Sequence, residues 1–241
     1  SFNEEDAVQS TVGNGVAIYD LTAENWAPVP LGTGITGNVG MVTSIAFYKG
    51  DLYAGGNFES AGVLAANNLA RWDGVKWDAL GKGILSDNAQ ISDAVKWNGK
   101  LIVGGNFKTF DGGNAKGLAL FDPQSQEWSE LGGGVMQSIH SGVVYTLHLE
   151  DNILYVGGKF SQAGDSTAAN FAHLNLQTMQ WFTYGTGVEM ITYSNSQVMV
   201  KDIDLYQGYP VITGFFEQVD GVNVSNMALF NGSQWQALGD P

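Results

Sequence analysis

"YAGGNFESAG", residues 53–62, indicates the kind of fold because its centre recurs along the chain. The same Gly-Gly-x-Phe core stands in "IVGGNFKTFDGG" at residues 102–113 and in "YVGGKF" at residues 155–160, and a weaker copy, "ITGFF", follows at residues 212–216. A tryptophan marks each repeat, with spacings of 51, 51, 53 and 54 residues between Trp26, Trp77, Trp128, Trp181 and Trp235. A period of about 50 residues indicates one structural unit repeated in tandem.

Each unit has the pattern of four short β-strands. In the second unit, "VTSIAFY" at residues 42–48 alternates with period two, "KGD" turns the chain, and "LYAGGNF" returns. Asp73-Gly74 then separates two short runs and is a strong hairpin signal. No segment shows a sustained helical period with caps, so we expect no helix of consequence.

Four-stranded units in tandem predict an all-β fold, a β-propeller of about five blades with the first incomplete. The paired glycines would let neighbouring backbones approach or would form bulges near the axis, and the phenylalanine would pack between blades. We expect one domain, 1–241, whose blades are an outer half-blade at 1–36 followed by full blades at 42–84, 91–135, 144–188 and 200–241.

The first unit contains only an outer half. Phe2 stands where the phenylalanine of the repeat is expected, and no inner strands precede it. Four full units and a half predict a fragment of a longer repeat protein. The alternative is a partner chain that supplies the missing inner hairpin and completes the first half-blade.

Composition excludes several classes of partner. Lys and Arg total 10 against 24 Asp and Glu, a net charge of −14, so the protein repels nucleic acid and anionic lipid. With 14% charged residues the surface is mostly Asn, Gln, Ser, Thr and Gly, as in many secreted proteins. The absence of Cys excludes disulfides, thiolate metal sites and Cys nucleophiles. No apolar run approaches the ~18 residues of a membrane span, so a membrane anchor would lie outside this chain.

Aligned innermost strands bring a few ionisable residues into register. Asp93 and Asp202 share one column, and His148 and Asp204 share the column two residues on. A glycosidase-like propeller would use carboxylates around its central cavity, which makes these four the weak catalytic candidates. A single "DID" strand beside a scattered Asp does not form the required pair, and such residues also line solvated channels or bond to backbone. We therefore predict no enzymatic activity.

Three aromatic residues occupy one repeated position at the end of the innermost strand: Tyr48, Trp97 and Tyr206. They are candidate ligand-binding residues because aromatic rings stack on sugars and anchor protein interfaces. Packing between blades is the alternative. Asn223 and Asn231 stand in glycosylation acceptor tripeptides, although such tripeptides also arise by chance and Asn231 fits a turn.

No metal site or cofactor is predicted. The three histidines show no ligand spacing. Acidic residues recur near glycines in the loops after the phenylalanines, at Asp111, Asp165 and Asp220. Calcium uses such carboxylates, but a full calcium-loop pattern is missing and turn chemistry explains them.

The combination of "LYAGGNF", "NNLARWDG" and "LGKGI" resembles the kelch-like propeller repeats of the fungal cortical polarity-marker family, cell-surface glycoproteins involved in bipolar bud-site selection. It is also similar to secreted bacterial repeat proteins. The resemblance implies an extracellular or cell-surface ectodomain without a catalytic motif. We expect a noncatalytic interaction or adhesion scaffold whose blade-top loops bind a protein or glycan. The alternative is a carbohydrate-binding or glycoside-hydrolysing propeller that uses its central cavity.

Overall fold

The structure, a computed structural model, describes residues 17–20, 22, 24–28, 34–37, 40–84, 89–110, 113–189 and 198–238, with backbone alone for 17–20 and 25–28. Every regular element in these ranges is a β-strand, which confirms the all-β prediction. Phe2 and the rest of residues 1–16 lie outside the described residues.

Four of the four-stranded antiparallel sheets in the described residues form the body of the molecule, each with its strands in chain order, and a fifth, made of short strands between residues 135 and 167, belongs to the connections between them. The first sheet consists of β4 (Met41–Tyr48), β5 (Asp51–Asn57), β8 (Leu69–Trp72) and β9 (Trp77–Ala79). The second consists of β10 (Gln90–Trp97), β11 (Lys100–Asn106), β14 (Leu118–Asp122) and β15 (Glu127–Glu130). The third consists of β18 (Val143–Glu150), β19 (Ile153–Lys159), β22 (Phe171–Asn175) and β23 (Gln180–Phe182). The fourth consists of β25 (Met199–Tyr206), β26 (Tyr209–Phe215), β29 (Met227–Phe230) and β30 (Trp235–Ala237).

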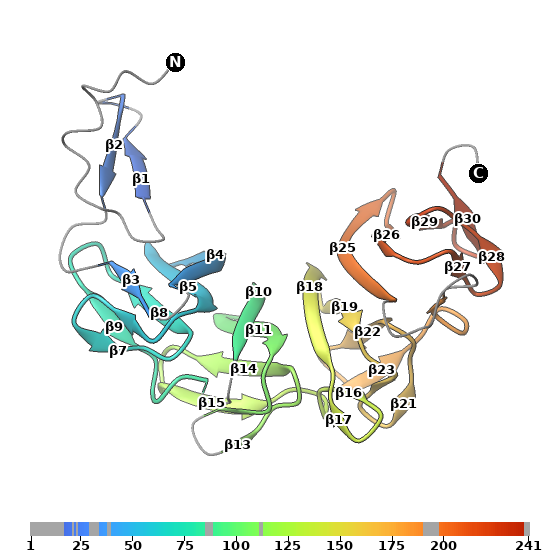
Figure 1. Cartoon of the computed structure of the whole chain (residues 1–241), viewed down its shortest axis with the longest axis horizontal. Helices are drawn as coiled ribbons and strands as arrows, with labels where there is room; N and C mark the ends of the chain where they lie inside the picture. The colour runs from blue at the N-terminus through green and yellow to red at the C-terminus, as the bar shows by residue number, and fades with distance from the viewer. Residues whose placement is uncertain are drawn as a thin grey trace.

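Figure 1 shows these sheets side by side along an arc. The innermost strands β4, β10, β18 and β25 follow the concave side, and neighbouring ones contact each other. A separate two-stranded sheet, β1 (Ala17–Asp20) with β2 (Asn25–Pro28), lies at the N-terminal end of the arc. The molecule is thus a β-propeller whose blades are the four sheets. Residues 17–28 fall in the predicted outer half-blade, and the part of them that the structure describes contains these two strands.

Short extra strands connect neighbouring sheets. The loop after each repeat phenylalanine forms a hairpin that pairs with the segment entering from the preceding sheet, through Ile35 with Ala61, Ile84 with Phe110, Val135 with Ala163, and Val188 with Val219. The strands are β3 (Ile35–Thr36), β6 (Ser60–Ala61), β7 (Leu64–Ala65), β12 (Thr109–Phe110), β13 (Gly113–Asn114), β16 (Val135–Gln137), β17 (His140–Ser141), β20 (Gln162–Ala163), β21 (Ser166–Thr167), β24 (Val188–Glu189), β27 (Gln218–Val219) and β28 (Val222–Asn223). The sequence predicted polar loops here, so these strands are an addition to the expected four per unit.

A repeated asparagine holds the hairpin against the sheet. Asn170 has a left-handed backbone, φ 69°, which Asn tolerates better than most residues. Its Oδ1 accepts a hydrogen bond from the backbone N–H of Phe160 at 3.0 Å, and its Nδ2 donates to the carbonyl of Val188 at 3.4 Å. Asn68 makes the same pair of contacts in the first sheet, and Gly117 takes the position in the second.

The two glycines of each repeat have different structural roles. A Cβ on Gly105 would lie 2.0 Å from the carbonyl oxygen of Gln90, in the neighbouring strand of the same sheet. A Cβ on Gly104 would lie 2.5 Å from Cγ1 of Val144, in the next sheet. The second glycine therefore permits the pairing within a blade, whereas the first permits the approach of the following blade. In the last sheet the first glycine is replaced by Thr213.

Gly104→Ala is expected to lower the free energy of unfolding by about 1 to 3 kcal/mol, because the added methyl displaces Val144 and Leu147 of the next sheet. Thr213→Ala is the matched control and should change that free energy by less than about 1 kcal/mol, since no four-stranded sheet follows the last one in the described structure. Urea unfolding of both variants checks the prediction. Equal losses would contradict the assigned role of the first glycine.

Candidate functional site on the concave face

Every innermost strand contains a β-bulge at the same place. The pairing register shifts between Val42 and Ser44 in β4, and the same shift recurs in β10, β18 and β25. A bulge inserts one residue that is not part of the ladder and changes the direction of its side chain. The inserted residues are Thr43, Ser92, Tyr145 and Lys201.

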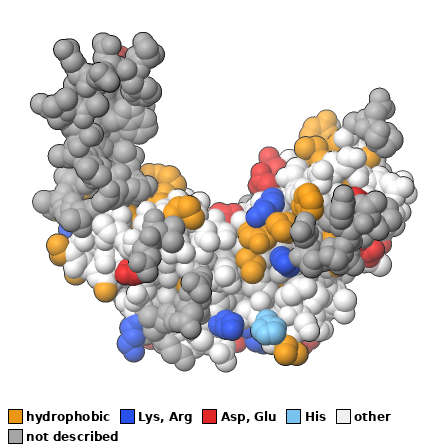
Figure 2. Space-filling model, viewed as in Figure 1, with side chains coloured by type: hydrophobic (Ala, Val, Ile, Leu, Met, Phe, Trp, Pro, Cys, Tyr) orange, Lys and Arg blue, Asp and Glu red, His pale blue; other side chains and the backbone are white. Residues whose placement is uncertain are grey.

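The four inserted residues line one pocket of about 400 Å³, together with Gln90, Asn106 and Val143. Strands from all four sheets contribute to it. Figure 2 shows basic, acidic and hydrophobic side chains on the wall of the concave side. We refer to this pocket as the bulge pocket. It is the point on the concave face where one residue of each blade converges.

A cation and an aromatic ring meet in the bulge pocket. Lys201 Nζ lies 3.5 Å from the centroid of the Tyr145 ring, within the range of a cation–π interaction. Among the described residues, no carboxylate forms an ion pair with Lys201. The hydroxyl of Thr43 donates a hydrogen bond to the carbonyl of Ile91 and joins the first two sheets at the pocket wall.

Asp93 links the second sheet to the third. Its Oδ1 accepts a hydrogen bond from the N–H of Ala94 at 2.7 Å, and its Oδ2 accepts one from the N–H of Leu147 in β18 at 2.8 Å. Burial raises the pKa of Asp93, and the two backbone donors oppose part of that rise. Both oxygens of the most buried candidate carboxylate are therefore engaged with backbone.

The other three catalytic candidates lie near Asp93 but do not form a carboxylate pair across the pocket. Asp202 Oδ1 accepts from the N–H of Ile203 at 3.0 Å. Asp204 is 83% exposed, and its Oδ1 lies 3.8 Å from Nδ1 of His148. None of the four candidates is among the residues that line the bulge pocket. Catalytic roles for these residues stay predictions. The contacts that they make in the structure are hydrogen bonds to backbone N–H groups and the approach of Asp204 to His148.

The repeated aromatic position packs between sheets where a following sheet is present. Tyr48 packs against the apolar cluster shared by the first and second sheets. Trp97 packs against the next cluster, and its Nε1 donates to Oδ1 of Asn152 at 3.0 Å. Tyr206, in the last sheet, is 58% exposed. Of the three candidates, Tyr206 alone presents most of its ring to solvent.

The two glycosylation candidates are both exposed. Asn223 Oδ1 accepts a hydrogen bond from Nε2 of Gln218 at 2.7 Å. Asn231 Oδ1 accepts from the backbone N–H groups of Ser233 and Gln234 at 3.1 and 3.0 Å, which is the geometry of an Asx turn. Asn231 therefore forms the turn that was the alternative to glycosylation. The side-chain amide of Asn223 takes part in fewer hydrogen bonds among the described residues than that of Asn231.

The loop carboxylates do not converge. No group of three or more His, Asp or Glu residues able to hold a metal occurs in the part of the chain that the structure describes. Asp220 Oδ1 instead accepts from the backbone N–H of Thr186 at 3.0 Å. Asp111 lies outside the described residues. The described part also contains no helix long and apolar enough to cross a membrane.

His173 is a half-buried imidazole in an aromatic cluster. Its ring stacks on Phe182 with centroids 5.2 Å apart and lies 5.0 Å from the Tyr184 ring. Its Nδ1 is buried without a hydrogen-bond partner among the described residues. Burial lowers the pKa of His173 from 6.5 to about 4.

The pH dependence of stability follows from that lowered pKa. The unfolded chain binds a proton on His173 near pH 6.5, while the folded chain resists it until about pH 4. Stability is therefore lost as the pH falls between these values, by about 1 to 2 kcal/mol after allowance for partial exposure. Urea unfolding at pH 7 and pH 4.5 measures the loss. His173→Phe should reduce it by that amount, and an unchanged loss would contradict the assignment.

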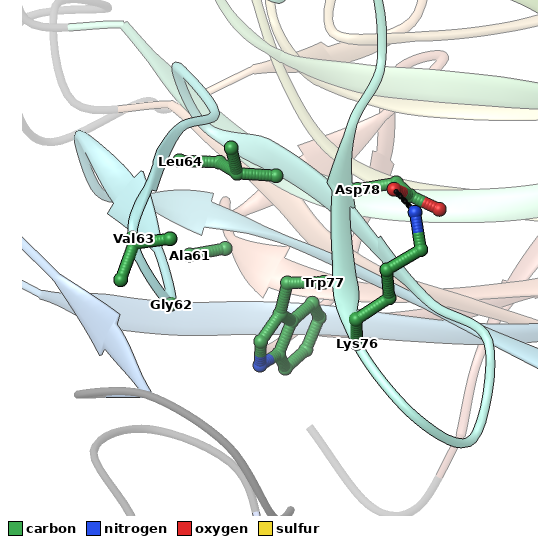
Figure 3. A pocket seen from close by; sticks show the side chains of 7 residues that line it. All are labelled: Ala61, Gly62, Val63, Leu64, Lys76, Trp77 and Asp78. Atoms are coloured by element: carbon green, nitrogen blue, oxygen red, sulfur yellow. Dashed lines mark hydrogen bonds and ion pairs between the residues drawn. The ribbon is translucent and has the colours of Figure 1, made fainter.

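A second pocket, of about 500 Å³, lies on the first sheet and the hairpin beside it (Figure 3). Val63 and Leu64 lie opposite Trp77, and Lys76 Nζ forms an ion pair with Asp78 Oδ1 at 2.7 Å. Trp77 Nε1 is buried and donates to no described residue. The equivalent indoles of Trp128, Trp181 and Trp235 donate to the carbonyls of Leu80, Gly132 and Tyr184, in the connection after the preceding tryptophan. The connection equivalent for Trp77, residues 29–33, lies outside the described residues, so we assign no ligand to this pocket.

The bulge residues were missed by sequence alignment of the repeats. That alignment selected Ser44, Asp93, Thr146 and Asp202, each of which follows the inserted residue by one position. A bulge shifts the alternation by one residue, so a strict period of two selects the wrong neighbour. The available signal was variation: the inserted position differs in all four units, whereas an apolar residue precedes it every time.

Comparison with known proteins gives a family and a fold. The sequence matches the family profile of the Rax2 C-terminal beta propeller domain over residues 16–131 and 86–203. No curated protein matches the sequence. The structure is similar to the extracellular domain of a protein described as a hybrid two component system, BT4673 from B. thetaiotaomicron, with a TM-score of 0.52 and 11% identity over 83% of this chain and 21% of that chain.

Two computationally designed proteins are also similar. Ika4 has a TM-score of 0.41 and 14% identity over 71% of this chain and 84% of its own. Ika8 has a TM-score of 0.42 and 12% identity over 78% of this chain and 54% of its own. The kelch-like character of the repeats stays a prediction.

Proposed function

Because the chain belongs to the family of the Rax2 C-terminal beta propeller domain, we propose that it is a noncatalytic interaction scaffold at the cell surface, in the marking of cell polarity. The blades would hold binding residues in fixed positions, and a protein or glycan partner would recognise them. Extracellular placement, glycosylation at Asn223 and the identity of the partner belong to this proposal.

The hydrogen bonding of Asp93 carries the noncatalytic part of the proposal. A glycosidase needs two carboxyl groups that flank the scissile bond, one of which donates or accepts a proton. Both oxygens of Asp93 are occupied by backbone N–H groups, and Asp204 is 83% exposed and outside the bulge pocket. This arrangement favours a structural role for Asp93, in which its carboxylate joins two blades, rather than a role as a catalytic acid or base.

Exposed apolar residues at hairpin tips support a protein partner. Val63, at the tip between β6 and β7, is 90% exposed, and Ile139, between β16 and β17, is 85% exposed. Val75, between β8 and β9, is 66% exposed. Apolar side chains held on short, well-anchored turns are the kind of residue that a partner buries at the centre of an interface.

A binding assay with a catalytic control tests this proposal. Labelled chain is applied to intact cells of the source organism, with the variant V63S/V75S/I139S as the comparison. We expect saturable binding that the variant loses by on the order of tenfold. The same preparations are assayed against aryl glycosides. Turnover by the wild-type chain that Asp204→Asn removes would refute the noncatalytic role, and binding unaffected by the triple variant would refute the role of the tips.

Carbohydrate binding without hydrolysis is a second candidate function. The bulge pocket favours it, because hydroxyl and amide side chains surround one aromatic ring in a concavity formed by all four sheets. This candidate is compatible with a scaffold, since the tips and the concave face are separate surfaces.

A further inference from the structure

We propose that the bulge pocket binds a single carboxylated sugar unit of the uronic acid type. This inference rests on the proposed noncatalytic function and adds the chemical class of a ligand and the site that takes it.

The first argument is the contrast between repeated and variable positions within the chain. The second glycine is present in all four sheets, and each has an apolar residue just before the bulge. The inserted position itself holds Thr, Ser, Tyr and Lys in turn, and all four of these residues are among those that line the pocket. Packing would favour the same residue in each blade. Four different side chains at one convergence point are what an asymmetric ligand requires.

The second argument is the chemistry of these side chains. A sugar ring has an apolar C–H face and a rim of hydroxyl groups. The part of the Tyr145 ring that Lys201 does not cover would offer the stacking surface, and Thr43, Ser92, Gln90 and Asn106 offer hydroxyl and amide groups for the rim.

The third argument is charge. Lys201 Nζ is held 3.5 Å from the Tyr145 ring centroid and is the one cation among the seven residues that line the pocket. A carboxylate bound next to the stacked ring would pair with it through a charge-assisted hydrogen bond. The protein has a net charge of −14, so ligands with several negative charges are repelled over a longer range. A neutral sugar that carries a single carboxylate can pair with Lys201 and is repelled less by the net negative charge than a ligand with several carboxylates.

The test is titration of the whole chain with three probes by calorimetry: methyl β-D-glucuronide, methyl β-D-glucoside and inorganic phosphate. We expect the glucuronide to bind, the neutral glucoside to bind about tenfold more weakly, and phosphate to bind more weakly than the glucuronide. Lys201→Met should weaken binding of the glucuronide by about tenfold and binding of the glucoside by much less, so that the difference between the two sugars disappears. Tyr145→Ala should weaken both sugars.

Lys49→Met is the matched control, because Lys49 Nζ also lies over a tyrosine, 5.1 Å from the Tyr48 ring centroid, but outside the pocket. It should bind like the wild type, and thermal unfolding of every variant confirms that it is folded. No glucuronide binding, equal affinity for glucuronide and glucoside, phosphate binding as tight as the glucuronide, or equal effects of the two lysine variants would overturn the inference. Those outcomes leave cell binding and the absence of hydrolysis unaffected, so they are distinguishable from failure of the proposed function.

Discussion

Replacing Gly105 with alanine is expected to lower the free energy of unfolding by about 4 kcal/mol, a large fraction of a domain's net stability. The new Cβ would lie 2.0 Å from the carbonyl oxygen of Gln90 and 3.0 Å from Cα of Ile91. Both atoms belong to the backbone of β10, so no side chain can rotate away to relieve the contact. The pairing of β10 with β11 must open at its bulge. Urea unfolding, or soluble yield if the variant does not fold, measures the effect.

Gly50→Ala is the control for Gly105→Ala. Gly50 has φ 90° and nothing within 4 Å of an added Cβ, so alanine there suffers backbone strain alone. That strain amounts to about 1 kcal/mol. If the two variants unfolded at the same urea concentration, the close contact with β10 would not be what selects glycine at the second position of the repeat.

Phe107→Ala is expected to lower the free energy of unfolding by about 3 to 5 kcal/mol. The side chain is 1% exposed and belongs to the apolar cluster between the first and second sheets, with Ile84 and Phe110 among its members. Its loss leaves a cavity where the hairpin that follows the repeat phenylalanine meets the blade. Thermal and urea unfolding both report the change.

Phe182→Ala provides the comparison for Phe107→Ala. Phe182 is 42% exposed and stacks on His173, so its removal should lower stability by about 1 kcal/mol or less. A loss at Phe107 no greater than the loss at Phe182 would mean that the repeat phenylalanine does not fill the space between blades.

The blade architecture was predictable because the signals are local and repeated. The alternation in residues 42–48, the Asp73-Gly74 turn and the Gly-Gly pairs specify strands and hairpins within single units. The repetition of such signals along the chain, with Gly-Gly in three sheets and Thr213-Gly214 in the fourth, removes the ambiguity that a single short strand would have. The prediction of an all-β propeller is confirmed by the four-stranded sheets and by the family match.

The hairpins that connect neighbouring sheets could not be predicted from such local signals. Their strands have two or three residues, and the partner of Val135, for example, is Ala163, which lies 28 positions along the chain. Such pairing is decided by the way two blades approach each other, which no local period encodes. The sequence does carry one sign of this pairing. A Gly-x-Gly motif follows four of the repeat tryptophans, and the apolar residue after it, Ile35, Ile84, Val135 or Val188, makes the pairing with the next hairpin.

The candidate site was half predictable. The prediction placed its candidate residues on the innermost strands, and these strands also provide six of the seven residues that line the bulge pocket. It selected Asp93, whose carboxylate accepts a hydrogen bond from the backbone of the next blade. It missed Lys201, because the β-bulge in β25 interrupts the alternation of side chains. Hydrogen bonds between sheets and local breaks in register arise from tertiary packing, so repeats aligned on a strict period do not reveal them.

A binding site built from the four bulges is tested by the backbone amide NMR shifts of the folded chain during titration with methyl β-D-glucuronide. We expect the largest shifts at Thr43, Ser92, Tyr145 and Lys201, one residue from each blade, with no release of sugar. Shifts centred on Asp93 and Asp204 with cleavage of an aryl glucuronide, or shifts confined to the hairpin tips, would contradict a noncatalytic binding site built from the four bulges.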